Sequence, residues 1–240
     1  MTASRPARCA PLRPLVIALG CALLAACAAR PPEAPPGPAA GWQAAIGALE
    51  IAGEPEICTA VLVRPDLIAT TSHCLHPRGR VISAGLITFT SSAGAEKSQG
   101  VAIIKQGGNI VPGTIHQDQA QTDWALVRIA PPLSRIGPIA IAPMSAASAR
   151  ARIAKGAVFY SAGYGSGAKD RLTPHRRCGL LPPDPKGQVE GDLFFATSCI
   201  IRLGDSGGPV ALIIGSRPEL IGLIVGFAQQ PDTGESIGVV

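Results

Sequence analysis

Six residues near the C-terminal end of the sequence could carry nucleophilic chemistry: Gly204–Pro209, with the sequence GDSGGP. Glycines around Ser206 let the backbone turn tightly and let a substrate carbonyl approach main-chain N–H groups. Such donors stabilise the negative oxygen of a tetrahedral intermediate. A serine hydroxyl is a weak nucleophile alone, so it needs a base, and the base needs an orienting group. The alternative interpretation is a glycine-rich surface turn with a passive serine.

A possible base and a possible orienting acid occur upstream. His73 lies at the end of a strand-like run, and Asp123 opens the apolar run DWALV at 123–127. Each has an ordinary structural explanation by itself, as a surface or packed histidine and as a strand-capping aspartate. Asp118 is a rival acid, but it lacks an apolar strand behind it that would bury it. The other histidines are His76, His116 and His175.

Together the three segments resemble the trypsin/chymotrypsin-like serine proteases. The matching motifs are TSHC at 71–74, DWAL at 123–126 and GDSGGP at 204–209. Their order (His, Asp, Ser) is the order of that family, and the separations of 50 and 83 residues are compatible with it.

The resemblance implies hydrolysis of peptide bonds through an acyl-enzyme, without a cofactor or a metal. Ser206 would be the nucleophile, His73 the base and Asp123 the orienting acid. The N–H groups of Gly204 and Ser206 would form the oxyanion hole. A protein or peptide would be the substrate.

Composition and turn residues favour β structure. The chain has 240 residues, with 28 Gly and 23 Pro, and short apolar runs alternate with turns, which is typical of a sandwich or of barrels. The resemblance narrows this to an all-β fold with two antiparallel six-stranded β-barrels and the active site between them. We expect the N-terminal barrel at 42–134, an interdomain connection at 135–156 and the C-terminal barrel at 157–240.

Individual elements follow from the same pattern. One short stretch, Ala146–Lys155, permits a helix. The predicted strands are Ala45–Ile51, Ile57–Val63, Leu67–Thr71, Gly85–Phe89, Val101–Ile104, Trp124–Ile129, Val158–Ala162, Leu193–Ala196, Pro209–Ile214 and Leu220–Phe227.

The first 41 residues predict export and anchoring. A basic start and the apolar run Leu15–Leu24 form a signal peptide over 1–26, and LAAC at 24–27 resembles the lipobox of bacterial lipoproteins. Cys27 would then be lipidated; the alternative is an ordinary secretory signal cut after Ala26. Residues 27–41 are rich in Pro and Ala and form an extended tether. We expect an exported lipoprotein of the bacterial envelope, facing the periplasm, with the outer membrane favoured by Ala28.

Charge gives little support to a nucleic-acid partner. Without three arginines of the signal peptide, 18 basic residues face 16 acidic ones, and no Lys/Arg cluster remains. We expect a monomer whose partners are its substrate and a lipid membrane.

Cysteine usage agrees with export. Of seven cysteines, two lie in the signal peptide and Cys27 is assigned to lipid, which leaves an even number. The resemblance implies a Cys58–Cys74 disulfide beside His73, and Cys178 with Cys199 is the leftover pair. Free or metal-binding thiols are the alternative, although no CxxC spacing supports a metal site.

Two features depart from the family pattern. Ile200 occupies the position where members that cleave after Arg or Lys carry Asp. With Val225 and Phe227, it would form a pocket for small or aliphatic side chains. Asp205 lacks the freed Ile-Val N-terminus that pairs with it in many members. We therefore expect no activating cut and suggest Arg202 or Arg152 as its partner.

Two other functions remain open from sequence alone. The chain could be a catalytically silent, protease-like adaptor that kept the motifs, or an esterase that uses the same three residues.

Overall fold

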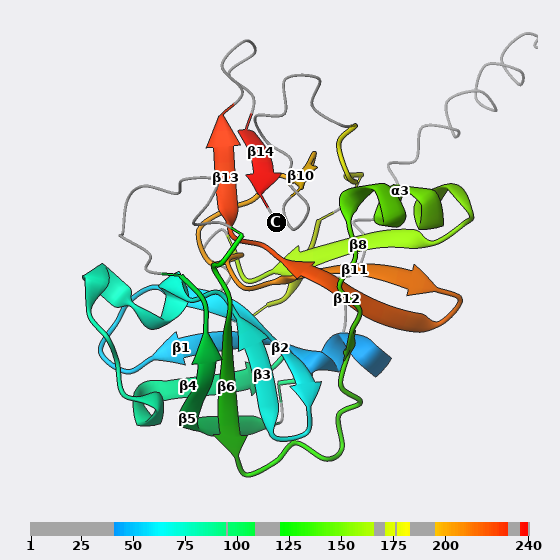
Figure 1. Cartoon of the computed structure of the whole chain (residues 1–240). Coiled ribbons are helices and arrows are strands. Elements are labelled where there is room, and N and C mark those ends of the chain that lie inside the picture. Colours follow the sequence, from blue (N-terminus) through cyan, green and yellow to red (C-terminus); the bar gives the residue numbers. More distant parts are fainter. Residues whose placement is uncertain are drawn as a thin grey trace, which may run out of the picture. The chain divides into compact units, whose positions relative to one another are not determined.

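Six antiparallel strands close into a barrel in the first half of the chain, in the order β1–β2–β3–β6–β5–β4 (Figure 1). The computed structural model describes residues 41–94, 96–108, 121–165, 171–175, 177–182, 195–229 and 236–239, without the side chains of 227–229 and 236–239. These residues belong to one compact unit, Pro38–Val240. The barrel strands are β1 (Ile46–Ile51), β2 (Ile57–Arg64), β3 (Leu67–Thr70), β4 (Ile87–Ser91), β5 (Lys97–Gln106) and β6 (Ala125–Ala130).

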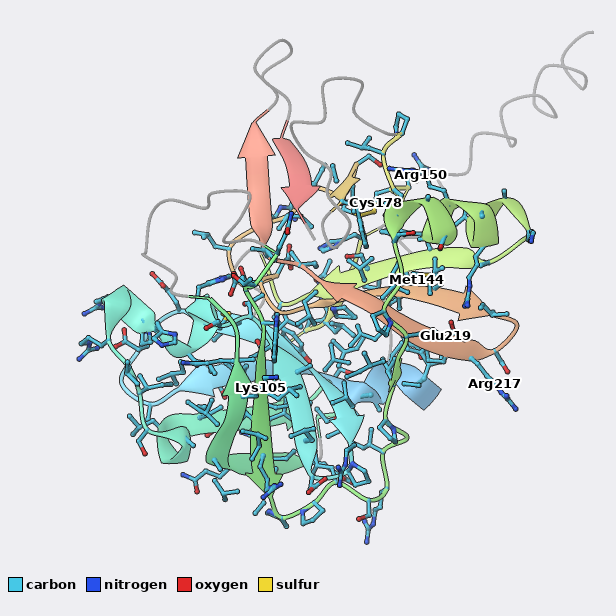
Figure 2. All side chains as sticks on the ribbon, in the orientation of Figure 1. Lys105, Met144, Arg150, Cys178, Arg217 and Glu219 are labelled. Carbon is cyan, nitrogen blue, oxygen red and sulfur yellow. A yellow bond between two sulfur atoms is a disulfide. The ribbon has the colours of Figure 1, made fainter. Side chains whose placement is uncertain are left out.

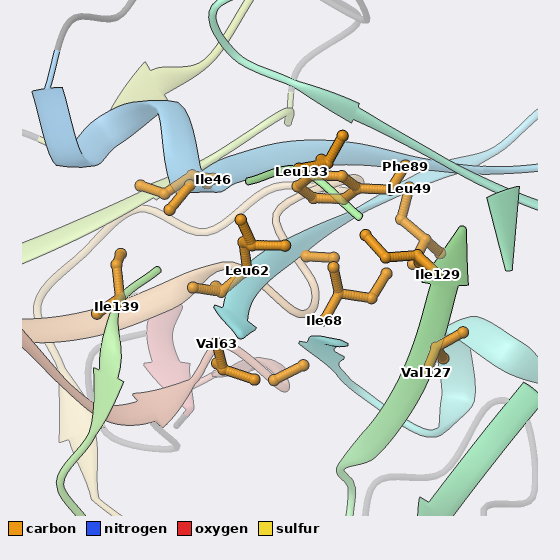
Figure 3. Close-up of a cluster of buried hydrophobic side chains, with 14 of the residues drawn as sticks. Ile46, Leu49, Leu62, Val63, Ile68, Phe89, Val127, Ile129, Leu133 and Ile139 are labelled. Carbon is orange, nitrogen blue, oxygen red and sulfur yellow. The ribbon is translucent and has the colours of Figure 1, made fainter. Parts of the chain in front are cut away.

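Apolar side chains from all parts of the barrel fill its interior (Figure 3). Phe89, Leu62 and Ile129 are almost completely buried there. Strands β1 and β2 are buried on both faces for most of their length, instead of alternating. The reason is that the same apolar cluster includes Ala162 and Leu220 from the second half, so the outer face of the barrel is covered too.

Two further sheets and one α-helix make up the described second half. A five-stranded sheet has the order β7–β12–β11–β8–β9, and a three-stranded sheet has the order β10–β14–β13. Among the described residues these sheets do not close, so a second barrel stays a prediction. The strands are β7 (Ala140–Ile141), β8 (Val158–Gly163), β9 (Thr173–Pro174), β10 (Ala196–Thr197), β11 (Pro209–Ile214), β12 (Arg217–Leu223), β13 (Gly226–Gln229) and β14 (Ser236–Val239).

Helix α3 (Ala146–Ala154) packs on this second half. Its Ala146 and Ala149 belong to an apolar cluster with Val210 and Leu212 of β11. Side chains around the helix and around strand β12 are drawn in Figure 2. Short 3₁₀ turns complete the described elements: η2 (Gly41–Ala45), η3 (His73–Leu75), η4 (Pro77–Gly79) and η5 (Ala84–Leu86).

Most predicted elements are present, and one is divided. The helix expected at 146–155 is confirmed, as are the strands of the first half, with ends shifted by a few residues. The single strand predicted over Leu220–Phe227 is wrong, because β12 ends at Leu223 and β13 begins at Gly226. Between them Ile224 exchanges backbone hydrogen bonds with Gly207 and Gly208 instead of continuing the ladder.

Several sequence-based expectations lie outside the described residues. They are the signal peptide at 1–26, nearly all of the tether at 27–41 with Cys27, and also His116 and Asp118. Among the residues that the structure does describe, no helix has the length and apolar character needed to cross a membrane.

Burial shifts the acid–base behaviour of both tyrosines of the chain. It raises the pKa of Tyr160 and that of Tyr164 to about 12. The Tyr160 ring packs edge-on against Trp42, with centroids 4.7 Å apart, and its hydroxyl is buried without a hydrogen-bond partner among the described residues. The cause is the same in both, because an ionised phenolate would lose its hydration.

These values predict a late tyrosine titration. In the folded protein, tyrosinate absorbance at 295 nm should rise near pH 12, whereas the denatured chain should titrate near pH 10. Because the folded pKa lies above the unfolded one, the tyrosines' contribution to stability is fully present below about pH 10 and is lost as pH rises towards about 12. Tyr164→Phe should halve the absorbance change; half of the native signal appearing near pH 10 would contradict the prediction.

Candidate active site

Strand pairing brings His73 and Asp123 together at one end of the barrel. Strand β3 ends at Thr70, which pairs with Ala125 of β6. Past Thr70 the chain turns into η3, whose first residue is His73, and Asp123 lies two residues before β6. The antiparallel register therefore places these residues opposite one another, although 50 residues separate them.

Two hydrogen bonds join the pair. The His73 backbone N–H donates to Asp123 Oδ1 at 3.0 Å, and His73 Nδ1 lies 2.6 Å from Oδ2. The Asp123 side chain is 1% exposed and that of His73 is 29% exposed. A carboxylate only accepts, so the neutral ring carries its proton on Nδ1. The other ring nitrogen, Nε2, is then free to accept a proton from a neighbouring group.

The loop of Ser206 is hydrogen-bonded to residues of both halves of the fold. Thr59 of β2 donates its N–H to the Ser206 carbonyl at 2.8 Å and its hydroxyl to the Gly204 carbonyl at 2.7 Å. On the other side, Gly207 N–H donates to Ile224 O at 2.8 Å. Sequence reasoning missed Thr59, because nothing in the run ICTAVLV distinguishes it from an ordinary strand residue.

One position of the loop accepts only glycine. Gly207 has φ of +80°, and a Cβ there would lie 2.2 Å from both the Thr59 carbonyl oxygen and Thr70 Oγ1. These two atoms are themselves hydrogen-bonded at 2.8 Å. The barrel and the loop are therefore so close at this point that there is no room for a side chain at residue 207.

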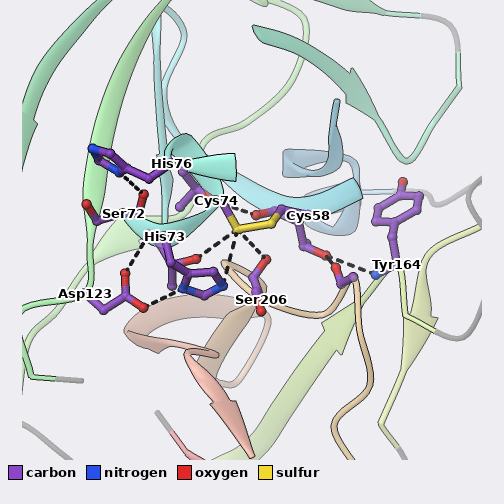
Figure 4. The surroundings of a disulfide bond; sticks show 12 residues. Cys58, Ser72, His73, Cys74, His76, Asp123, Tyr164 and Ser206 are labelled. Atoms are coloured by element: carbon purple, nitrogen blue, oxygen red, sulfur yellow. Dashed lines mark hydrogen bonds and ion pairs between the residues drawn. A yellow bond between two sulfur atoms is a disulfide. The ribbon is translucent and has the colours of Figure 1, made fainter. Parts of the chain in front are cut away.

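The disulfide Cys58–Cys74 lies beside the histidine and the serine (Figure 4). Its Cys74 Sγ is 3.8 Å from His73 Nε2 and 3.8 Å from the Ser206 carbonyl oxygen. The bond joins β2 to η3, so it ties Cys74, the residue after His73, to the barrel. The pairing implied by the resemblance is confirmed, and so is the second disulfide, Cys178–Cys199.

A metal is a poor fit beside His73. Ligand-type atoms of Cys58, His73 and Cys74 lie within 4.8 Å of one another. Both sulfurs are bonded in the disulfide, however, and a cysteine binds a metal as a thiolate. The group is better explained as the surroundings of the histidine.

A cavity of about 310 Å³ opens over these residues. His73, Gly204 and Ser206 line it together, with Tyr164 and the Cys58–Cys74 disulfide. The lining from β1, β2 and the turn between them is partly apolar, with Leu49 and Ile57, and partly acidic, with Glu54 and Glu56. Two of the three residues predicted to act together therefore share one cavity, and the third is hydrogen-bonded to the histidine behind it.

Of the predicted specificity residues, Ile200 and Val225 do not line that cavity. Ile200 is 68% exposed. Val225 lines another cavity, of about 390 Å³, with Asp123 and Trp124. The side chain of Phe227 lies outside the described residues. A pocket made of these three residues stays a prediction.

Asp205, the residue before the serine, has a partner that sequence reasoning missed. His175 Nε2 lies 3.1 Å from Asp205 Oδ2. The suggested Arg152 pairs with Glu219 instead, and the suggested Arg202 donates its backbone N–H to Asp205. A histidine 30 residues before the acid gave no local signal in the sequence.

Comparison with known proteins agrees with this geometry. No curated protein matches the sequence. Among solved structures, the fold is similar to that of a thermostable serine protease, AL20, from an extremophilic microorganism, with a TM-score of 0.54 and 17% identity over 82% of this chain and 90% of that one. The family model for the trypsin-like peptidase domain matches residues 58–223, which include all three motifs. The chain therefore belongs to the trypsin-like peptidase family.

Proposed function

We propose that this protein is a serine endopeptidase that cleaves peptide bonds through an acyl-enzyme on Ser206. The observation that carries the proposal is the hydrogen bond between His73 Nδ1 and Asp123, together with the cavity that His73 and Ser206 line in common. Membership of the trypsin-like peptidase family supports the reaction class.

Each residue has a defined task in this mechanism. His73 Nε2 takes the Ser206 hydroxyl proton while the oxygen attacks a substrate carbonyl, and Asp123 stabilises the imidazolium that forms. His73 then gives the proton to the leaving amine, which departs and leaves the acyl-enzyme. Water, deprotonated by His73, attacks the ester and releases the acid and the free serine.

Backbone hydrogen bonding supports an oxyanion hole at Gly204 and Ser206. The N–H groups of Asp205, Gly207 and Gly208 are all bonded to carbonyl oxygens. Within the described part of the chain, no carbonyl accepts from the N–H of Gly204 or Ser206, and both residues line the cavity. Two N–H donors without a carbonyl partner, on residues that line a cavity, are suited to bind a developing oxyanion.

An active-site-directed fluorophosphonate tests the proposal. Folded wild-type protein should be labelled at Ser206, and Ser206→Ala should not be labelled. Asp123→Asn should lower the labelling rate by about 10⁴-fold, because the amide favours the wrong histidine tautomer. Folded wild-type protein that resists labelling would favour the adaptor function, and labelled protein that hydrolyses esters but no peptides would favour the esterase function.

We also propose a preference for small or aliphatic residues before the cleaved bond, from Ile200, Val225 and Phe227. An apolar wall offers no counter-charge to Arg or Lys. A peptide-library profile should show cleavage after small or aliphatic residues, with Ser206→Ala protein as the control for contaminating proteases. A profile dominated by Arg and Lys would overturn this assignment.

Anchoring in the bacterial envelope is a further part of the proposed function. A signal peptide at 1–26, lipidation of Cys27 and a tether at 27–41 would hold the peptidase unit at a membrane surface, and the two disulfides support an exported protein. The outer membrane is the favoured site. In this proposal the second half, 157–240, completes a second barrel after a connection at 135–156.

Lipid attachment can be tested in a lipoprotein-exporting bacterium. A clickable fatty acid should label the wild-type chain, and the labelled protein should enter a detergent phase. Cys27→Ser should abolish both properties, whereas the matched variant Cys21→Ser should keep them. Unlabelled wild-type protein in the aqueous phase would favour the ordinary secretory signal.

A further inference from the structure

A second buried carboxylate lies directly beside the serine. Asp205 is 2% exposed. Its Oδ1 accepts from Gly165 N–H at 2.8 Å, and its Oδ2 accepts from Arg202 N–H at 2.8 Å and lies 3.1 Å from His175 Nε2. A charge removed from water to this extent persists only with several donors, and here an imidazole is one of them.

The surrounding backbone is shaped around this carboxylate. A Cβ on Gly163 would lie 2.4 Å from Asp205 Oδ1, and one on Gly165 would lie 2.5 Å from the same atom. Larger residues at either position would push the carboxylate out of its site. The end of strand β8 and the following turn therefore form a close-fitting cradle for Asp205.

His175 is itself held in a fixed orientation. Its side chain is only 9% exposed, and its backbone N–H donates to the Ser161 carbonyl at 2.8 Å. Its Nδ1 lies 3.0 Å from Ser161 Oγ, and Ser161 is 1% exposed. Buried residues thus connect β8, the histidine after β9 and the carboxylate next to the nucleophile.

Two side-chain hydrogen bonds, one to each ring nitrogen, orient the His175 imidazole. The Asp205 carboxylate only accepts, so His175 Nε2 carries a proton that points at it. The Ser161 hydroxyl both donates and accepts, so it can donate to Nδ1 of the neutral ring or accept from an imidazolium. Without the hydroxyl, Nδ1 would lose this partner and the ring would lose one of its two side-chain hydrogen bonds.

Asp205 connects the fixed imidazole of His175 to the backbone of the Ser206 loop. Its N–H donates to Arg202 O at 3.0 Å and its carbonyl accepts from Gly208 N–H at 2.8 Å, so its backbone lies inside the turn that carries Gly204 and Ser206. We propose that His175, supported by Ser161, is a positioning residue that holds the oxyanion-binding turn through Asp205. The inference rests on the proposed peptidase function, and it supports the expectation that no activating cut is needed.

Fluorophosphonate labelling of the full chain can separate positioning from folding. The maximal labelling rate (kinact) and the inhibitor affinity (KI) are measured for wild type, His175→Ala, His175→Gln and Ser161→Ala, each normalised to the folded fraction seen in thermal unfolding. Glu219→Gln is the matched control, because it breaks an ion pair with Arg152 elsewhere in the second half. Glu219 is labelled in Figure 2 and belongs to β12.

The expected result is a loss in kinact alone. His175→Ala should lower kinact roughly 10- to 100-fold with unchanged KI, the range that follows from losing a hydrogen bond to a charged group. His175→Gln keeps an amide donor and should recover part of that loss. Ser161→Ala should lower kinact by a smaller factor, and Glu219→Gln should match wild type.

Three results would overturn the inference. The first is a wild-type kinact in both His175→Ala and Ser161→Ala, and the second is a loss of kinact no larger than the loss of folded protein. The third is a kinact of His175→Gln no higher than that of His175→Ala. If His175→Ala does not fold, His175→Gln and Ser161→Ala decide, and wild-type kinact in both rejects the role. A folded wild type that is not labelled at all removes the proposed function, and this inference with it. Wild-type labelling with unaffected variants removes the inference alone.

Discussion

The contact between Thr59 and the loop of Ser206 sets the geometry of the site. His73 and Asp123 belong to the barrel, whereas Ser206 belongs to the second half, so their relative position depends on what joins the two. Thr59 is fully buried, and besides its two bonds to the loop, its Oγ1 accepts from Tyr164 N–H at 3.0 Å. Each buried group left without its partner costs about 1–3 kcal/mol, so a shift of the loop along β2 would be penalised several times over.

Two carboxylate–histidine pairs flank the serine, and their burial separates their roles. Asp123 and Asp205 are both buried, and each receives a backbone N–H as well as an imidazole. The ring of His73 is 29% exposed and faces the cavity, whereas the ring of His175 is 9% exposed and its second nitrogen is taken by Ser161. In the proposed mechanism the first pair exchanges a proton with a substrate, and the enclosed second pair has the proposed positioning role.

The sequence allowed prediction of those parts whose chemistry is local. His73, Asp123 and Ser206 could be proposed from the sequence because each lies in a short motif, and Cys58 with Cys74 followed from the resemblance. Thr59, Ser161 and His175 were missed because their importance arises from contacts 14 to 145 residues away along the chain. The division of the strand over Leu220–Phe227 was missed for a similar reason, since the apolar run continues through Ile224 while its backbone pairs with the loop.

The same distinction explains why the motif GDSGGP is informative while its surroundings are not. Gly207 is required because a Cβ would meet Thr59 and Thr70, and Asp205 is required because a cradle of glycine backbone is built for its carboxylate. A Cβ at Gly207 would clash with backbone, and the glycines around Asp205 leave room for its carboxylate, so both residues of the motif have a steric reason. The residues that contact the loop use a carbonyl, a hydroxyl or an imidazole. Many positions of the chain could offer such a group. The loop residues can therefore be predicted from the motif, whereas the residues that contact the loop can be identified only from the fold.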